Sequence, residues 1–237
     1  MQGGCNPYDP LYSFDDVREL SYKCDYAIVI YHGNKEYYRY PSPEVQRMCR
    51  KFAECGAGIV LCQHSHCIGA AEKYNKSELV YGQGNFLFYG GETDEYFQTG
   101  SLVQVDINEN TKECLVTYIP IVKNGVTIRL ASESEKQEIL KEFMDRSRQI
   151  EVLGFVEENY RKFASSMIDT YYSRCLAKVR KNIIFKCINK LLKGRVLESC
   201  FSEKECIEIL NTIQCEAHRE LFLEGLKGKI YGKTGKS

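Results

Sequence analysis

The chain has 237 residues, of which 43% are hydrophobic and 27% charged, and its 32 basic side chains balance 32 acidic ones. This neutral balance excludes a protein that binds nucleic acid through bulk positive charge. The composition is that of a folded globular protein and excludes a mostly disordered chain.

The sequence contains no apolar run of the roughly 18–20 residues that a membrane-spanning helix requires. No signal peptide can be recognised at residues 1–5, so we expect a cytoplasmic or membrane-associated protein. The 12 cysteines are scattered along the chain rather than grouped. We interpret them as mostly buried, reduced thiols.

Buried strands, loops and a helix alternate in the first part of the chain. Residues 25–31 (DYAIVIY) are almost all apolar and rich in β-branched side chains, which predicts a strand buried on both faces. An N-cap serine followed by proline begins the helix predicted over residues 42–56. Further short strands are predicted at residues 58–61 and 78–81. This alternation is typical of an α/β fold with parallel strands.

The pattern changes near residue 101. Residues 102–107 and 113–122 alternate apolar and polar side chains around a polar turn, which predicts an antiparallel hairpin followed by a short strand at 126–130. The remaining sequence has helical periodicity over residues 133–149, 151–192 and 202–226. We therefore predict an α/β domain over residues 1–131, a helical extension over 132–226 and a flexible tail over 227–237.

Three of the four histidines follow the first two predicted strands. His32 comes directly after residues 25–31, and His64 and His66 follow residues 58–61. The carboxyl ends of adjacent parallel strands meet at one edge of a sheet, where α/β folds place ligand and catalytic groups. The three imidazoles are therefore expected to converge, and imidazole is a suitable ligand for Zn, Mn and Fe.

These histidines have two other interpretations. A histidine at the end of a strand is commonly a hydrogen-bonded structural residue rather than a metal ligand. A structural zinc site is the second alternative, because Cys62, His64, His66 and Cys67 place four ligands within six residues. That spacing is too tight for a single tetrahedral centre. The expected convergence of three imidazoles therefore favours a metal site that includes His32.

Several motifs occur in order along this part of the chain. They lie at residues 25–36 (ending in HGNKE), 41–46, 56–60, 63–66 (QHSH), 72–74 and 81–86 (YGQGNF). Together they resemble the bacterial CapA family of capsule and poly-gamma-glutamate synthesis proteins, over about residues 5–107. The resemblance implies an α/β fold, the C-terminal half of a calcineurin-like metallophosphoesterase-type αββα sandwich, followed here by a helical C-terminal extension.

The resemblance also implies roles for single residues. His32 corresponds to the histidine of the family's H-x-G-x-E motif, with Glu36 as its acid. His64 and His66 correspond to the outer histidines of G-H-x-P-H, and Asn85 to the asparagine of a G-N-F turn. This correspondence implies His32, His64 and His66 as metal ligands and His32, Glu36 and Asn85 as catalytic residues. The implied cofactor is a divalent metal, Mn, Fe or Zn, with two ions in the complete protein.

Some positions depart from the family pattern. Gly33 and Asn34 replace a tryptophan and a glycine, although asparagine tolerates a positive φ. The second motif has Cys62, Gln63 and Ser65 in place of glycine, histidine and proline. The family's upstream half, with a Gly-Asp and an Asn-Asn-His motif, is not found before Asp25. We therefore expect a C-terminal portion of a CapA-like protein, impaired as an isolated chain. The strand at 25–31 should then lie near an open sheet edge, or be covered by the C-terminal tail or a partner chain.

Aromatic and basic side chains border the predicted site. Lys35, Tyr37, Tyr38 and Arg39 would bind or stack on an anionic polymer or phosphoester substrate. A tyrosine-rich loop that only covers the end of the sheet is an equally good interpretation.

The helical region has a basic segment. Residues 171–195 contain eight Lys or Arg side chains and no acid, interleaved with apolar residues. Such a helix can bind an anionic membrane surface, whereas the acidic flanking segments favour a helix neutralised within its own bundle.

The sequence as a whole leads to two hypotheses for the function. The first is a CapA-like, metal-dependent hydrolase of cell-surface polymer synthesis, completed by an N-terminal half or a partner chain. The second is a non-catalytic polymer-binding or membrane-surface assembly component.

Overall fold

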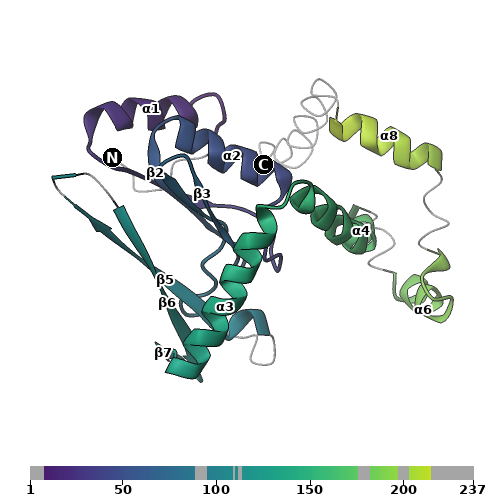
Figure 1. The fold of residues 1–237 in the computed structure, drawn as a ribbon. Helices are drawn as coiled ribbons and strands as arrows, with labels where there is room; N and C mark the ends of the chain where they lie inside the picture. The colour runs from purple at the N-terminus through teal and green to yellow at the C-terminus, as the bar shows by residue number, and fades with distance from the viewer. Residues whose placement is uncertain are drawn as a thin grey trace, which may run out of the picture. The chain divides into compact units, whose positions relative to one another are not determined.

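The computed structural model describes residues 8–88, 95–108, 110–111, 114–175, 182–196 and 203–214. These residues form a mixed α/β protein with two sheets (Figure 1), which confirms the predicted α/β class. The chain divides into two compact units, residues 1–165 and 166–237. The first unit holds both sheets. The predicted boundary after residue 131 falls inside this unit, and the three-region division stays a prediction.

A four-stranded sheet with the order β1-β2-β4-β3 is the centre of the first unit. Its strands are β1 (Ala27–His32), β2 (Ala57–Gln63), β3 (Ala71–Tyr74) and β4 (Ser77–Val80). β1, β2 and β4 are parallel and match three predicted strands, whereas β3 pairs antiparallel with β4. β3 was not predicted, because its four residues, AEKY, contain no apolar run.

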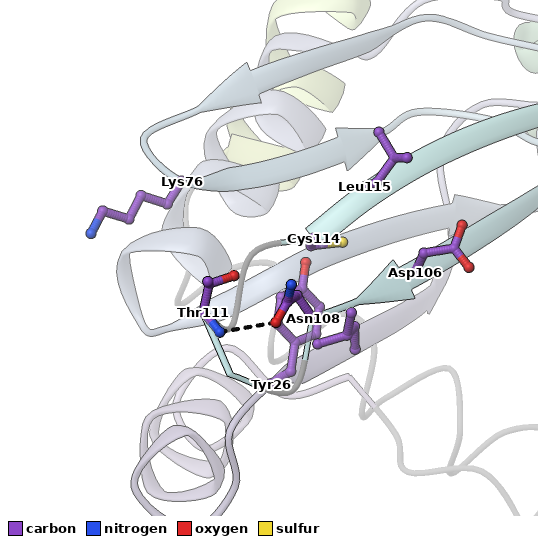
Figure 2. Close-up of a pocket in the computed structure, with 8 residues that line it drawn as sticks. Tyr26, Lys76, Asp106, Asn108, Thr111, Cys114 and Leu115 are labelled. Carbon is purple, nitrogen blue, oxygen red and sulfur yellow. Dashed lines mark hydrogen bonds between the residues drawn. The ribbon is translucent and has the colours of Figure 1, made fainter.

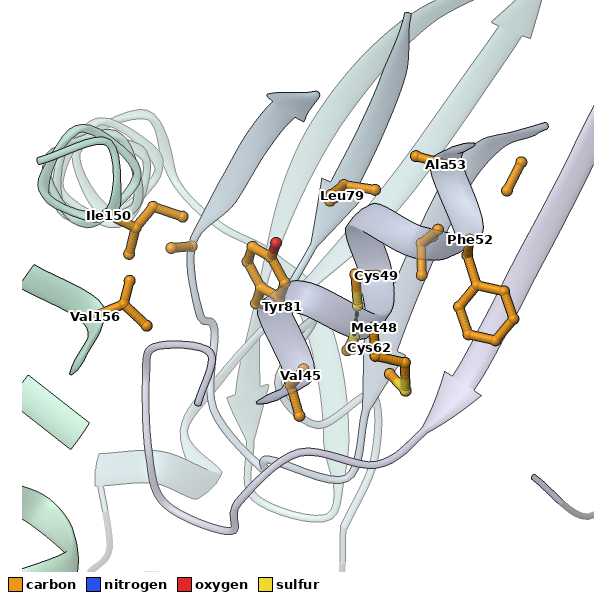
Figure 3. Packing of buried hydrophobic residues seen from close by; sticks show 13 residues of the cluster. Val45, Met48, Cys49, Phe52, Ala53, Cys62, Leu79, Tyr81, Ile150 and Val156 are labelled. Atoms are coloured by element: carbon orange, nitrogen blue, oxygen red, sulfur yellow. Dashed lines mark hydrogen bonds between the residues drawn. The ribbon is translucent and has the colours of Figure 1, made fainter. Parts of the chain in front are cut away.

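Helix α2 (Pro43–Glu54) covers one face of this sheet. It begins as predicted, because the Ser42 hydroxyl accepts a hydrogen bond of 3.3 Å from the Val45 N–H. Figure 3 shows its apolar side against the strands. The labelled members of this core are Val45, Met48, Cys49, Phe52, Ala53, Cys62, Leu79, Tyr81, Ile150 and Val156.

Helix α1 (Ser13–Lys23) precedes β1 and was not predicted. It contacts β1, β2 and α2, and its Phe14 and Val17 are only partly buried against the α2 core. Two apolar contacts in three turns give a weak periodic signal, so the sequence did not distinguish this helix from a linker.

The second sheet packs against the other face of the first. It consists of β5 (Thr99–Ile107), β6 (Cys114–Asn124) and β7 (Thr127–Leu130) in antiparallel order, which confirms the predicted hairpin and third strand. The inner side chains of the two sheets form a second core with α3. Its members include Ile59, Leu61, Val80, Val103, Val105, Val116, Tyr118 and Phe143.

Helix α3 (Glu133–Ile150) is part of this packed unit and begins with a capping box between Ser132 and Glu135. Phe143 packs on Tyr118 with ring centroids 4.5 Å apart. The Arg146 Nε donates a 2.9 Å hydrogen bond to the Gly69 carbonyl. The helix therefore fixes the loop between β2 and β3 as well as covering apolar surface.

The two edges of the first sheet differ in how they are covered. β3 is tied to α2 by the buried Glu72, which accepts 2.8 Å hydrogen bonds from Nε and Nη2 of Arg50 and a 2.7 Å bond from the Tyr81 hydroxyl. Among the residues that the structure describes, β1 pairs only with β2, and its Ile28 and Ile30 are 43% and 65% exposed. The predicted open edge at β1 is confirmed for these residues, whereas the prediction that this strand is buried on both faces is wrong, because one face of β1 is exposed.

Helices account for the rest of the described chain. They are α4 (Phe155–Cys175), α6 (Ile183–Leu191) and α8 (Glu203–Gln214). The segment 151–192, predicted to have helical periodicity, contains two of these helices, because the Asn182 side chain accepts a 3.0 Å hydrogen bond from the Ile184 N–H and starts a new helix. Residues 176–181 and 215–237, including the predicted tail, lie outside the described residues. No described helix is both long and apolar enough to cross a membrane.

Candidate metal centre

The ends of three parallel strands place the candidate residues at one edge of the first sheet. β1 ends at His32, which pairs in register with Gln63 at the end of β2. The turn after β4 leads to Asn85, and it is held by isolated bridges from Gln83 to Ile68 and from Gly84 to Gly100. The expected convergence of the residues that follow these strands is therefore confirmed.

The loop after β2 has an uncommon backbone. His64 and His66 adopt positive φ angles of 86° and 57°. Between them, Ser65 is buried, its hydroxyl donates to the Cys67 carbonyl at 3.0 Å, and its own carbonyl accepts from the Tyr37 N–H at 2.8 Å. Non-glycine residues at positive φ cost about 1–3 kcal/mol each and persist where surrounding contacts fix them. These contacts therefore hold both imidazoles in place.

Three ligand-type side chains meet beside this loop. One ligand atom from each of Glu36, His64 and His66 lies within 4.8 Å of the other two. The Nε2 of His64 is 3.6 Å from Oε1 of Glu36, which is too long for a normal hydrogen bond. Two imidazoles and one carboxylate are a donor set that suits Zn, Mn or Fe. The arrangement could therefore hold one divalent cation.

His32 lies next to this group rather than within it. Its Nε2 is 3.2 Å from Nδ1 of His64, the ring nitrogen opposite the one that faces Glu36. The structure thus brings all three predicted imidazoles together. The roles of His32, His64 and His66 as ligands, and of His32, Glu36 and Asn85 in catalysis, stay predictions.

Aromatic rings fix the orientation of His66. Its ring is stacked with Tyr37 at 5.9 Å and with Phe97 at 5.8 Å, and Phe88 meets it edge-on at 5.1 Å. The Oδ1 of Asn85 lies 2.9 Å from Nδ1 of His66. These contacts leave the ring little rotational freedom.

The histidines and Asn85 line a cavity of about 380 Å³. Amide side chains of Gln63 and Gln83 add to its polar lining, while residues 86–88 (Phe-Leu-Phe) supply an exposed apolar wall. A larger hollow of about 1060 Å³ lies at the opposite strand ends, between Tyr26, Lys76 and the β5–β6 turn (Figure 2). None of its lining residues is a histidine, so the chemistry points to the smaller cavity.

The four predicted substrate-binding residues fall into different environments. Tyr37 is exposed beside His66, and Lys35 is partly exposed on the same loop. The Arg39 guanidinium lies 5.0 Å from the Tyr96 ring centroid. Tyr38 is only 5% exposed, packs on Phe163 and Tyr160 and accepts a 3.0 Å hydrogen bond from Asn159. Its burial raises the pKa of Tyr38 to about 12.

The cysteines near the site point elsewhere. Cys62 and Cys67 are buried, and Sγ of Cys62 lies 3.4 Å from Sγ of Cys49 in the α2 core. Within the described parts of the chain, no cysteine joins the cluster of Glu36 and the imidazoles. The geometry therefore gives no support to a zinc site with mixed cysteine and histidine ligands.

Sequence reasoning missed the aromatic residues that surround His66. Tyr96 and Phe97 lie in a short 3-10 helix (Glu95–Phe97) far from the histidines in sequence. Gly100 was also missed, although a Cβ at this position would lie 2.2 Å from the Asn85 carbonyl oxygen. No local signal could have found these contacts, because they depend on β5 lying beside the turn after β4.

Comparison with known proteins identifies the region that contains this site. Residues 9–90 match the family model described as "Bacterial capsule synthesis protein PGA_cap". This segment is therefore similar to the bacterial capsule synthesis family. The resemblance seen in the motifs is therefore confirmed over the part of the chain that carries His32, Glu36, His64, His66 and Asn85.

Two curated relatives are similar to the same part of the chain. The "PGA biosynthesis protein CapA" of Bacillus subtilis (strain 168) is 29% identical over 107 residues, which are 45% of this chain and 28% of that protein. The "Capsule biosynthesis protein CapA" of Bacillus anthracis is 24% identical over 119 residues, which are 50% of this chain and 28% of that protein. The chain thus spans less than a third of the length of these relatives.

Proposed function

We propose that this chain takes part in the synthesis of capsule or poly-gamma-glutamate polymer through a metal-dependent hydrolase or transferase site. The observation that carries the proposal is the meeting of Glu36, His64 and His66 within 4.8 Å of one another. These residues come from two loops of the segment that matches the family. The proposed cofactor is Mn, Fe or Zn.

The chemistry follows from this donor set. A divalent cation held there would lower the pKa of a bound water and polarise a phosphoryl or acyl oxygen. His32 is exposed beside these three ligands and is the candidate for moving the proton of the leaving group. Asn85 is within hydrogen-bonding distance of His66 and supports it.

The substrate is proposed to be an anionic polymer or phosphoester. Lys35 and Arg39 supply positive charge on the loop that follows β1, and Tyr37 presents an exposed ring beside His66. The apolar wall at residues 86–88 would contact the uncharged part of a chain of repeating units.

We also propose that the two sheets form half of a metallophosphoesterase-type αββα sandwich. The packing of α2 on one sheet and of the second sheet on its other face supports this assignment. The exposed edge of β1 would then pair with strands from an N-terminal half or a partner chain, which would bring the carboxylates needed for a second cation.

Metal-dependent hydrolysis tests the proposal. The chain would be loaded separately with Mn, Fe and Zn and assayed on a chromogenic phosphodiester and on gamma-glutamyl oligomers. Because the carboxylates for a second cation are missing, we expect a weak activity that requires the metal and is lost in Glu36→Gln and His64→Ala. It should be retained in Glu138→Gln, which changes an exposed carboxylate of α3. A chain that binds one of these metals and hydrolyses neither substrate would contradict the catalytic part of the proposal.

The second candidate function is that of a membrane-surface assembly component, and helix α6 favours it. Ile183 and Leu191 of this helix are 74% and 81% exposed. The described residues 182–196 carry four basic side chains and no acidic one. An amphipathic helix of this composition binds the surface of an anionic bilayer.

Sedimentation with vesicles tests this second candidate. We expect the chain to bind phosphatidylglycerol-containing vesicles and to lose this binding in Lys186→Glu/Lys190→Glu. Vesicles of phosphatidylcholine alone are the control. Equal binding of the variant and the unchanged chain would contradict a role for α6.

A further inference from the structure

A second cavity lies on the other side of the loop that follows β2. Its volume is about 290 Å³, at the lower end of the roughly 300–1,000 Å³ that small-molecule sites occupy. Its apolar lining consists of Ile68, Val122 and Ile139, and its charged lining of Arg39, Arg146 and three glutamates of α3. A cavity of this size and mixed lining suits a small ligand that has both charged and apolar parts.

The guanidinium of Arg146 is almost buried in this cavity but only partly hydrogen-bonded. Its side chain is 10% exposed. Nε donates a 2.9 Å hydrogen bond to the Gly69 carbonyl, and Nη1 donates a 3.2 Å bond to Oε2 of Glu142. Nη2 has no hydrogen-bond partner among the described residues. Because no fully buried side-chain nitrogen in that part of the chain lacks a partner, Nη2 must be accessible from the cavity. The cavity thus contains an N–H donor that needs an acceptor.

A second guanidinium lines the same cavity. Nη1 of Arg39 donates a 3.4 Å hydrogen bond to the Ile68 carbonyl. Burial, and after it the positive charge of Arg39, lowers the pKa of Arg146. Two like charges at a partly buried site repel each other, and a carboxylate bound between them would offset the repulsion. The two arginines therefore favour an anionic group on the ligand.

Helix α3 adds negative charge beside the arginines. Glu142 lies one helical turn before Arg146, on the same face of the helix. Its Oε2 pairs with Arg146, whereas its Oε1 has no partner among the residues that the structure describes, and the side chain is 58% exposed. Glu135, by contrast, is neutralised by Arg129, which donates two hydrogen bonds of 2.7 Å. Glu142 therefore favours a positively charged group on the ligand, next to the anionic one.

We propose that Arg146, Arg39 and Glu142 bind the head group of an α-amino acid, with its carboxylate on the two guanidiniums and its ammonium on Glu142. The adjacent opposite charges of the head group match the adjacent charges of the Arg146–Glu142 pair. Hydrogen bonds between charged groups are the stronger ones in proteins. The apolar lining around Ile68 contacts the methylene groups of the ligand.

Aromatic rings connect this cavity with the candidate metal centre. The Arg39 guanidinium lies 5.0 Å from the Tyr96 ring centroid, Tyr96 is 5.5 Å from Tyr37, and Tyr37 stacks on His66 at 5.9 Å. A ligand with its head group at Arg146 would extend over these rings towards His66.

The amino end of a γ-linked glutamyl polymer carries such a head group. Every residue of this polymer keeps its α-carboxylate, but only the amino-terminal residue also keeps its α-ammonium. The cavity would therefore bind the amino end of the polymer. This step rests on the proposed function, whereas binding of a free amino acid does not.

Calorimetric titration of the metal-free chain with L-glutamate tests the head-group assignment. We expect one equivalent to bind. Glutarate, which lacks the ammonium group, and inorganic phosphate should bind about 10-fold more weakly or less, because a hydrogen bond between charged groups contributes a factor of about 10 or more. Glutarate or phosphate binding as tightly as L-glutamate would show a simple anion site and overturn the proposal. So would the absence of L-glutamate binding.

Two pairs of variants locate the site. Glu142→Gln removes the charge that faces the ammonium and should lower the affinity for L-glutamate about 10-fold or more. Glu138→Gln, the same change one turn earlier on the exposed side of α3, is its control and should leave the affinity unchanged. Arg146→Met should abolish binding, whereas Arg148→Met, at an exposed arginine of the same helix, should not.

The glutamate pair decides the matter even where Arg146→Met fails to fold. Equal losses in Glu142→Gln and Glu138→Gln would indicate long-range attraction by the acidic helix and overturn the proposal. Because the titrations contain no metal, a chain that does not bind L-glutamate contradicts this inference alone. A chain that binds L-glutamate but hydrolyses neither polymer nor phosphodiester contradicts the proposed function alone.

Discussion

β1 and β2 are alike in sequence but differ in their surroundings. Each is an almost uncharged strand rich in isoleucine and valine, AIVIYH and AGIVLCQ. β2 lies between β1 and β4 with Ile59 and Val60 fully buried, whereas β1 is at the edge with Ile28 and Ile30 exposed. Two strands of similar apolar composition can thus differ in burial, because burial depends on which neighbouring elements pack against each strand.

The difference extends to the candidate site, because both strands end there. The loop after β2 is fixed by the buried Ser65, which holds His64 and His66 in strained conformations. β1 itself ends at the exposed His32, and the loop that follows carries the exposed Glu36. One half of the site is therefore fixed by the core, and the other depends on an edge strand.

Alanine substitutions in the two strands should show the largest contrast. Ile59→Ala removes a buried side chain from between the two sheets and is expected to lower the free energy of unfolding by about 2–5 kcal/mol. Ile30→Ala, on the exposed face of β1, should change it by less than about 1 kcal/mol. Urea unfolding measures both. Comparable losses for the two variants would mean that β1 is covered in solution.

The opposite edge strand, β3, offers a second contrast with β1. Glu72→Gln removes the charge of a buried carboxylate that accepts hydrogen bonds from Arg50 and Tyr81. We expect it to lower the free energy of unfolding by about 1–3 kcal/mol. Glu54→Gln, on the exposed side of α2, serves as the control and should cost much less. Equal effects of the two variants in urea unfolding would show that the β3 edge is not held by Glu72.

The strained backbone of the loop after β2 predicts that glycine stabilises this loop more than alanine does. His66→Gly should be more stable than His66→Ala by about 1 kcal/mol, because glycine adopts a φ of 57° without a steric penalty. At Lys73, which lies on strand β3, the alanine variant should instead be more stable than the glycine variant. Thermal unfolding of the four variants checks this, and a more stable alanine at position 66 would argue against a strained loop.

A further effect, confined to alkaline solution, concerns the loop after β1. Burial raises the pKa of Tyr38 to about 12 from an ordinary value of 10.0. The folded state keeps the phenol proton after the unfolded chain has lost it, so this contribution is fully present below pH 10 and is lost as the pH rises towards about 12. Tyr38→Phe should reduce the loss of stability over this interval in urea titrations. The same slope in both proteins would mean that Tyr38 is accessible to solvent.

Much of the first unit follows from local patterns in the sequence. The strand runs, the Ser42 N-cap and the hairpin were predictable, because each depends on neighbouring residues. The convergence of His32, His64 and His66 also followed, since parallel strands end at one sheet edge. α1 and β3 were missed because their apolar signal is weak, and the helix break at Asn182 because apolar periodicity continues across it.

The details of the site required tertiary structure. The sequence did not indicate that Glu36 would lie beside His64 and His66. Nor did it indicate that His32 would contact Nδ1 of His64, the ring nitrogen opposite the one that faces Glu36. Which side of an imidazole faces a carboxylate depends on loop backbone angles, here the positive φ of His64 and His66. The closeness of Gly100 to Asn85 depends on the packing of two strands that are separate in the chain.

X-ray absorption by the zinc-loaded chain reports which atoms are bound to the metal. We predict a first shell of nitrogen and oxygen at about 2.0–2.2 Å with the scattering pattern of two imidazoles and no sulfur at about 2.3 Å. The same measurement on Glu36→Gln should show loss of this ordered site. A sulfur shell, or an ordered shell without imidazole, would contradict a metal centre formed by Glu36, His64 and His66.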